Sequence, residues 1–409
     1  MNTSKILARR LTTSYAFIQS YYNMSYCCII GFATVFLLSR NFTNIQIGIT
    51  LAVANTLSFL CQPVVAAFAD KSKKLALRNI VALLLLVLAV LAAILYMMPN
   101  MVLPTALLYL LLVCCQYLPG PLITSMAMEH NDAGTEINFG LARGIGSFAY
   151  AVLSFFMGFL THRFGGSAII LISIVLSLIS IISVSTFPKA SSVKDDRNDA
   201  SKKIGTQLFQ FALNNKRFVM VCISITLVYF SHVLLDTYLI QIIQHVGGNS
   251  TDVGIGYAIA GGLELPAMTL FPLLLKKIKS ASTIMKLSAV FFVIRAVIAL
   301  LAHNVAWVYV AQCCQFFAFA LLIPASVYFV DRIINGEDRV KGQAFMTMSM
   351  GISNVVGTVL GGFMLGANEN VGVMLGTGVT VSVIGLMMLV LIIPRDVERV
   401  DAPNSAEAF

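Results

Sequence analysis

Long stretches without a single charged residue dominate this chain. Residues 11–39 and 41–69 contain no Asp, Glu, Lys or Arg, and the uncharged stretch 79–128 is long enough for two membrane-spanning helices. A helix needs about 20 apolar residues to cross the hydrocarbon core of a bilayer. Charged residues make up 11% of the 409 residues, against about 25% in soluble globular domains. We therefore expect a polytopic protein of the lipid bilayer, and exclude a soluble enzyme, a disordered chain and a secreted disulfide scaffold.

The spacing of charges and prolines predicts how many spans there are. Pro99-Asn100 and Pro104 divide the stretch 79–128, because proline has no backbone N–H and stops a helix. The pattern predicts an all-α membrane protein with twelve transmembrane helices in two pseudo-symmetric six-helix bundles. The expected spans are 13–39, 43–69, 76–98, 102–129, 138–161, 166–187, 218–245, 252–275, 283–302, 305–330, 340–366 and 371–394.

Basic residues are distributed unequally between the two sides of these spans. Of the 27 Lys and Arg residues, only Arg40 and Arg163 fall in the odd-numbered loops. Because basic residues accumulate in cytoplasmic loops, we expect a multi-pass protein of the cell (inner) membrane with both termini in the cytoplasm. The same distribution explains the net charge of +9 without a clustered basic groove, so we expect no nucleic-acid partner.

The chain also contains an internal duplication. The hydrophilic stretch 188–217 separates six expected helices from six others, and the motif Cys-Cys-Gln-Tyr at 114–117 recurs as Cys-Cys-Gln-Phe at 313–316. Two related six-helix halves are typical of transporters whose solute site lies at the membrane midplane between the halves. We predict an N-terminal bundle over 1–188, a cytoplasmic linker over 189–216 and a C-terminal bundle over 217–409.

Several motifs resemble those of the major facilitator superfamily, and within it the oligosaccharide:proton symporters typified by bacterial lactose permease. Gln-Pro at 62–63 and Ala-Asp-Lys at 69–71 resemble the loop signature after the second helix, with Ser-Lys-Lys at 72–74 in place of its Gly-Arg core. The resemblance implies a secondary transporter. Asp70 and Lys71, with Glu129, are the residues we expect in a cytoplasmic gate.

The start of the fifth expected helix resembles the sugar-site segment of that subfamily. It reads Phe-Gly-Leu-Ala-Arg at 139–143, and Tyr150 falls where the subfamily stacks an aromatic ring on the sugar. The resemblance implies substrate binding by Arg143 and Tyr150. Alternatively, Arg143 extends to lipid headgroups at the end of the helix.

The chain departs from that subfamily at its other polar positions. Ser125 aligns with the sugar-binding carboxylate, and Phe316, Phe319 and Leu322 align with the Lys, His and Glu of the tenth helix. The proton-coupling groups of the subfamily are therefore missing from their usual places. If this chain couples transport to protons, other residues must do so.

Two ionisable residues are expected deep in the membrane. Glu264 lies near the middle of the eighth expected helix, two residues before Pro266, and Arg295 lies well inside the ninth. A charge at this depth costs several kcal/mol, so such residues are functional candidates. Glu264 and Arg295 form either a static ion pair or a proton-coupling pair in which the carboxylate gains and loses its proton.

A second ionisable pair is expected in the seventh helix. His232 and Asp236 are four residues apart and share a helix face. They serve either proton coupling or gating, or they form a static hydrogen-bonded pair.

Neutral polar side chains in the expected spans suit a neutral solute. Amides and phenols match hydroxyl groups without the desolvation penalty of a charge, although about half of such groups are expected only to bond between helices. The candidates for substrate binding are Asn23, Tyr26, Gln116, Gln315 and Asn354.

Together these features predict proton-coupled symport of a sugar or oligosaccharide by alternating access, with the chain acting as a monomer. The alternatives are a nucleoside, an organic anion or another small metabolite as the solute, or a non-transporting sensor of the same fold. The eight cysteines fall inside expected spans without metal-ligand spacing. We expect no cofactor, no metal site and no enzymatic activity.

Overall fold

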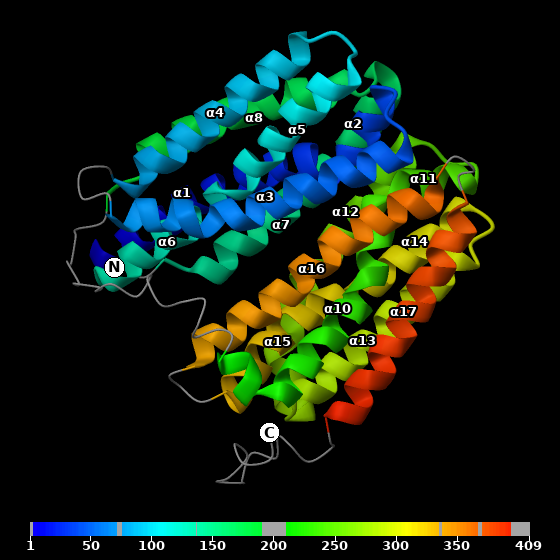
Figure 1. Cartoon of the computed structure of the whole chain (residues 1–409). Coiled ribbons are helices and arrows are strands. Elements are labelled where there is room, and N and C mark those ends of the chain that lie inside the picture. The colour runs from blue at the N-terminus through cyan, green and yellow to red at the C-terminus, as the bar shows by residue number, and fades with distance from the viewer. Residues whose placement is uncertain are drawn as a thin grey trace. The chain divides into compact units, whose positions relative to one another are not determined.

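The computed structural model of the chain describes residues 3–71, 76–135, 137–189, 210–334, 338–366 and 370–393 (Figure 1). Every regular element in these residues is helical. The α-helices are α1 (Thr3–Tyr26), α2 (Ala33–Ser39), α3 (Asn44–Lys71), α4 (Leu77–Met97), α5 (Val102–Tyr117), α6 (Pro119–Asp132), α7 (Phe139–Phe164), α8 (Ser167–Thr186), α10 (Lys216–Thr237), α11 (Leu239–His245), α12 (Ser250–Ile278), α13 (Ala281–Leu300), α14 (Val305–Cys313), α15 (Phe319–Ile333), α16 (Arg339–Leu365) and α17 (Val371–Ile392).

The described helices account for the predicted membrane spans. Eleven of them, counting α5 with α6 and α14 with α15, are long and apolar enough to cross a bilayer, and there are up to twelve when the bent pair Ile6–Gly31 and Ala33–Ser39 counts as one span. The prediction of an all-helical membrane protein is confirmed. Most predicted boundaries lie within a few residues of the observed ones.

Four predicted spans, however, are interrupted rather than continuous. The first changes from α1 into a π-helix at Cys27–Gly31 before α2, with a bend of 48°. The seventh is divided into α10 and α11 at Tyr238. The other two interruptions lie at the repeated motif. α6 starts at Pro119, two residues after the end of the motif at 114–117. In the second copy the motif itself forms a 3-10 turn at Cys314–Phe316, which separates α14 from α15.

The break between α5 and α6 has a local cause. Pro119 has no N–H to continue the hydrogen bonding of α5, but it suits the first turn of a new helix. At the break between α14 and α15 there is no proline, and Ser288 of α13 donates a hydrogen bond of 2.6 Å to the carbonyl of Ala318 there. The repeated motif thus marks a helix interruption in both halves of the chain.

The helices form two compact units. The first comprises Met1–Asn198 with Asn249–Gly261, and the second comprises Asp199–Gly248 with Gly262–Phe409. The first residues of α12 therefore belong to the unit that also contains α1 to α8. Most of the linker predicted at 189–216 lies outside the described residues, although 210–214 are helical and α10 already begins at Lys216. The division of the chain at that linker stays a prediction.

In the first unit, α1 packs against α7 and α8, and α4 packs against α8 and α5. Tyr15 and Ile18 of α1 belong to a buried apolar cluster with Leu85 of α4 and Ile123 of α6. Because lipid tails are as apolar as these side chains, helix contacts in a membrane depend on close van der Waals packing and on polar contacts rather than on exclusion from water.

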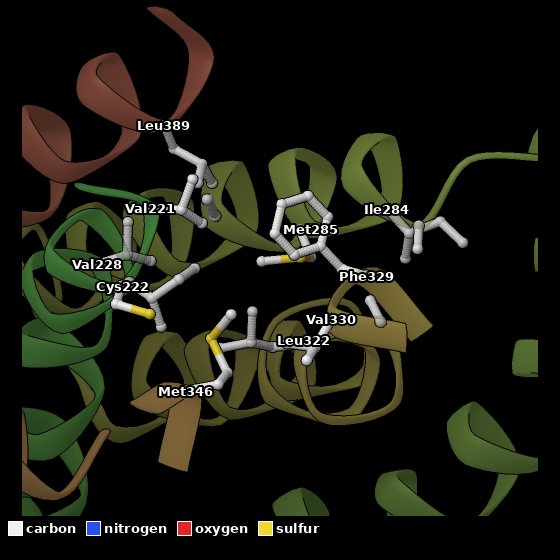
Figure 2. Packing of buried hydrophobic residues seen from close by; sticks show 14 of the residues in the cluster. Val221, Cys222, Val228, Ile284, Met285, Leu322, Phe329, Val330, Met346 and Leu389 are labelled. Carbon is white, nitrogen blue, oxygen red and sulfur yellow. The ribbon is translucent and has the colours of Figure 1, made fainter. Parts of the chain in front are cut away.

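In the second unit, α10 is the central helix. It packs against α13, α16 and α17, and most of its residues are buried. This surrounded position places the polar side chains of α10 inside the unit. Figure 2 shows part of the apolar cluster around α10, with Val221, Cys222, Val228, Ile284, Met285, Leu322, Phe329, Val330, Met346 and Leu389 labelled.

Candidate functional site

The largest fully buried side chain of the described residues is Arg295, in the second half of α13. Its exposed fraction is 0%, although α13 is a mostly apolar helix that a serine, Ser280, caps at its N-terminus. A guanidinium cannot be neutralised by losing a proton under ordinary conditions. A charge in this position is therefore tolerated only where acceptors surround it.

Four side chains surround the Arg295 guanidinium. Its Nη1 atom lies 2.6 Å from Nδ1 of His232 and donates to Oε1 of Gln315 at 2.6 Å. Its Nη2 atom donates to Oε1 of Gln312 at 2.6 Å and to Oδ1 of Asp236 at 3.4 Å. Each Nη atom carries two N–H groups, so all four of these donors are used. We call these five residues the Arg295 cluster.

The four side chains around Arg295 come from three elements: α10, α14 and the 3-10 turn that follows α14. His232 and Asp236 come from α10, one turn apart, as their spacing predicted. Gln312 is near the end of α14, and Gln315 is in the 3-10 turn that follows it. The break between α14 and α15 therefore lies next to two glutamines, Gln312 and Gln315, that both accept from the Arg295 guanidinium.

Three aromatic rings contact the imidazole of His232. The ring of Phe319 stacks on the imidazole at 5.1 Å, and those of Tyr229 and Phe292 meet it edge to face at 4.7 and 5.7 Å. His232 is buried, with 6% of its surface exposed. These contacts restrict rotation of the imidazole.

Asp236 differs from the rest of the Arg295 cluster in its exposure. Its side chain is 43% exposed, while that of its ion-pair partner Arg295 is 0% exposed. The cluster therefore has a buried cation and a carboxylate at its open edge. Such an arrangement lets the carboxylate exchange a proton or meet a solute without exposing the arginine.

The sequence predicts two separate pairs, Arg295 with Glu264 and His232 with Asp236. The structure instead brings Arg295 together with His232 and Asp236. Glu264 lies half-buried in α12, two residues before a proline. The difference arises because α10 is the central neighbour of α13, which span order alone does not reveal. Gln312 was missed; its only signal is its position one helical turn before the glutamine of the repeated motif.

A second polar group of side chains lies in the first unit and is neutral. Ser25 donates to Oε1 of Gln116 at 3.0 Å, and Tyr22 donates to the Gln116 carbonyl at 2.9 Å. The hydroxyls of Tyr26 and Tyr117 lie 3.3 Å apart. Gln116 is fully buried. It ties the interrupted span α5–α6 to α1, just as the second glutamine of the repeat ties α14–α15 to α13.

The remaining predicted solute contacts lie on three helices. Asn23 of α1 donates to the carbonyl of Gln19 at 2.8 Å, and Asn354 of α16 donates to that of Met350 at 3.2 Å. Arg143 is exposed on α7.

Tyr150, also on α7, is half-buried. A Cβ atom built on Gly31 would lie 2.7 Å from its hydroxyl oxygen. The hydroxyl of Tyr150 therefore lies against the end of the π-helix.

Of the predicted gate residues, Glu129 is exposed on α6. Asp70 and Lys71 end α3, but their side chains lie outside the described residues. The described residues contain no group of three or more His, Cys, Asp or Glu side chains that fits a metal ion. All eight cysteines are free thiols.

The fold and the site together define a polytopic helical membrane protein of two units, each with an interrupted span, and with a buried cation inside one of them. The sequence profile of the MFS_1 like family matches residues 13–374, and the chain belongs to that family. The predicted resemblance to the major facilitator superfamily is thereby confirmed. The narrower resemblance to oligosaccharide:proton symporters stays a prediction.

Solved structures share the fold at low sequence identity. The crystal structure of a mutant of the nucleoside transporter NupG superposes with a TM-score of 0.80 at 16% identity, covering 95% of this chain and 100% of that chain. An auto-inhibited POT family peptide transporter gives a TM-score of 0.72 at 10% identity, covering 97% and 99%. No curated protein sequence matches the chain. At these identities the likeness establishes the fold alone.

Proposed function

We propose that this protein is a secondary active transporter that moves a sugar or oligosaccharide together with protons by alternating access. The observation that carries the proposal is the Arg295 cluster. Ionisable residues inside membrane spans are costly, and they mark ion, proton or solute pathways. A cluster whose buried arginine pairs with a half-exposed carboxylate fits such a pathway better than a purely structural role.

Proton coupling is assigned to the ionisable residues Glu264, Arg295, Asp236 and His232. Burial favours the neutral form of a carboxyl group and a neighbouring cation favours its charged form. A carboxylate subject to both effects changes its protonation when its surroundings change. Rearrangement between the two access states would supply that change.

Solute binding is assigned to a set of polar side chains, and a neutral solute is favoured for two reasons. The polar groups around Tyr26 and Gln116 are uncharged, and the Nη donors of Arg295 are already used within the protein. An anionic solute would therefore find no free Nη donor there. The assigned residues are Arg143, Tyr150, Asn23 and Tyr26, with Gln116, Gln315 and Asn354 as further candidates.

The distribution of Lys and Arg supports the proposed orientation, with both termini in the cytoplasm of a cell whose inner membrane holds the protein. In this orientation Asp70, Lys71 and Glu129 lie on the cytoplasmic side, as proposed gate residues. A monomer is proposed as the working unit, with the solute, protons and lipid as its partners. No enzymatic step, cofactor or metal enters the proposal.

A nucleoside is the second candidate solute. The fold likeness to a nucleoside transporter favours it over an organic anion, and a nucleoside shares the neutral hydroxyl groups of a sugar. A non-transporting sensor of the same fold is the remaining alternative.

The test uses the purified full-length protein in liposomes with an imposed pH gradient. Uptake of a panel of radiolabelled monosaccharides, disaccharides and nucleosides is measured with and without the gradient. We expect gradient-dependent accumulation of one class, with nucleosides identifying the second candidate. Absence of both uptake and exchange for every solute would reject the transporter in favour of the sensor.

The coupling assignment is tested with Glu264→Gln. This change removes the exchangeable proton but keeps the shape of the side chain. We expect loss of uphill accumulation with solute counterflow retained, because exchange needs no net proton movement. Intact uphill uptake in this variant would exclude Glu264 from coupling.

A further inference from the structure

The imidazole of His232 has a protonation state that the geometry determines. The Arg295 guanidinium has five N–H donors and no acceptor. Its Nη1 atom lies 2.6 Å from Nδ1 of His232, so Nδ1 must be the acceptor. A neutral imidazole accepts at one nitrogen and carries its proton on the other. His232 is therefore neutral, with its proton on Nε2.

Protonation of His232 conflicts with this contact. A proton on Nδ1 would place two donors face to face at 2.6 Å, and two cations would share a buried site. The imidazole has little room to rotate away, because Phe319 stacks on it at 5.1 Å and Tyr229 and Phe292 meet its edges. Arg295 thus excludes the imidazolium form as long as the Arg295 cluster is intact.

The contact between Asp236 and the guanidinium is longer than the contact to His232. Three of the four contacts of the guanidinium, to His232, Gln312 and Gln315, are 2.6 Å long and use neutral acceptors. The contact to Asp236 is 3.4 Å, and the carboxylate is 43% exposed. Protonating Asp236 removes the longest contact and leaves the three short ones in place.

The other titratable side chains that face Arg295 are weak acids. Besides His232 and Asp236 they are Tyr229 and Cys314. A phenol and a thiol ordinarily lose their protons only well above neutral pH. Neither therefore exchanges a proton at the pH at which a carboxyl group does.

The charged residues of the helices packed on α10 lie elsewhere in those helices. α17 contains no ionisable residue, and the two in α16, Arg339 and Lys341, lie in its first turn. In α13 the other charged residue is Lys286, whose ammonium donates to the carbonyl of Ile393 at 2.7 Å. Asp236 is therefore the acid of the Arg295 cluster.

We infer that His232 is a positioning residue, held by Arg295 as the neutral Nε2–H tautomer, and that Asp236 alone exchanges the proton of the Arg295 cluster. The second part rests on the proposed proton-coupled function. The first part is a statement about the resting protein and is tested without transport. Gln312 and Gln315 share the positioning role, because they fix the guanidinium through two further short hydrogen bonds.

The tautomer is tested by NMR of the full-length protein labelled with ¹⁵N-histidine. The chain has five His residues, and the spectrum of His232→Asn identifies the signals of His232 by their loss. We expect one protonated Nε2 and one unprotonated Nδ1, unchanged between about pH 5 and pH 8. A His232 signal that titrates in this range, or that carries its proton on Nδ1, would overturn the inference.

The division of roles is tested with His232→Asn, His232→Phe and Asp236→Asn in liposomes, with lactose and uridine as probes. The Asn oxygen of His232→Asn replaces Nδ1 as an acceptor, while Phe offers none. We expect His232→Asn to keep gradient-driven accumulation with the pH profile of the unaltered protein, and His232→Phe to lose about tenfold or more in rate, because it leaves a buried donor of Arg295 unpaired. We expect Asp236→Asn to lose accumulation but not counterflow.

The outcomes separate the two proposals. If the unaltered protein accumulates neither probe under a gradient, the proposed coupling to these solutes fails, and the NMR result alone decides the role of His232. If it does accumulate a probe but His232→Asn abolishes the dependence on the gradient, His232 carries the proton and the inference is wrong. Unchanged accumulation in Asp236→Asn would equally contradict it.

Discussion

Gly158 of α7 and Gly254 of α12 are in backbone contact. A Cβ atom built on Gly158 would lie 2.9 Å from the α-carbon of Gly254, and one built on Gly254 would lie 2.6 Å from the α-carbon of Gly158. Small residues let two membrane helices approach this closely, and the resulting van der Waals contact holds them together. The contact lies within the first unit, to which the first residues of α12 belong.

Gly254→Ala should therefore destabilise the protein. The added methyl group meets the carbonyl oxygen of Ser154 at 2.5 Å and the backbone of Gly158, neither of which is a flexible side chain. Overpacking of this kind costs about 1–3 kcal/mol, and we expect a lower melting temperature in detergent. The matched control is Gly262→Ala in the same helix, where a Cβ meets nothing within 4 Å. Equal melting temperatures for the two variants would contradict the close contact.

Arg295→Lys should be strongly destabilising even though it keeps the charge. A lysine ammonium has three donors at one point and cannot reproduce the planar fork that reaches four acceptors. Each buried acceptor that loses its hydrogen bond in this variant costs about 1–3 kcal/mol. Thermal unfolding in detergent measures the effect, with Arg163→Lys at an exposed position of α7 as the control. A melting temperature like that of the control would mean that the guanidinium geometry is unimportant.

The hydrogen bond between Ser25 and Gln116 is best tested by a double-mutant cycle. Gln116→Leu leaves the fully buried hydroxyl of Ser25 without this acceptor, at a cost of about 1–3 kcal/mol. Adding Ser25→Ala removes the stranded hydroxyl, so the double variant should be more stable than the sum of the single changes predicts. Strict additivity of the three unfolding free energies would show that the two side chains do not interact in the membrane protein.

Arg40→Ala should destabilise the end of α4. Arg40 is one of two basic residues in the odd-numbered loops, and its guanidinium donates to Asn100 Oδ1 at 2.6 Å and to the carbonyl of Met98 at 3.0 Å. Loss of these bonds, which involve a charged donor, should cost about 1.5–3 kcal/mol. Protease accessibility of the segment around Asn100 reports the loss locally. Cleavage no faster than in an Arg163→Ala control would contradict a capping role for Arg40.

The sequence predicted several helix boundaries and one shared helix face. The boundaries of α4, α8 and α17 were predicted to within a few residues. A long uncharged stretch between charged or proline-containing segments crosses a bilayer as a helix, because the backbone hydrogen bonds must be made within the segment. The position of His232 and Asp236 on one face of α10, one turn apart, followed from helical periodicity alone. The repeat at 114–117 and 313–316 was recognised, but not its role at two helix breaks.

The contacts of the Arg295 cluster were not predicted from the sequence. Each of its members is visible in the sequence as a polar residue in an apolar stretch, yet the partner of Arg295 was expected to be Glu264 in the neighbouring span. Sequence order makes the eighth and ninth spans neighbours along the chain, whereas in the folded unit α10 packs on α13 and brings Asp236 to the guanidinium. Gln312 had no signal beyond its spacing from Gln315.

The sequence by itself determined which segments cross the membrane, because transfer of an uncharged helix into lipid depends on its own composition. Only the tertiary structure decided which buried polar groups meet. That outcome depends on which helices are neighbours, on the end of α14 and the 3-10 turn after it, which carry Gln312 and Gln315 to Arg295, and on glycines that let α7 and α12 touch. These are relations between distant segments, and a buried charge is stable only where its acceptors are brought to it from several of them.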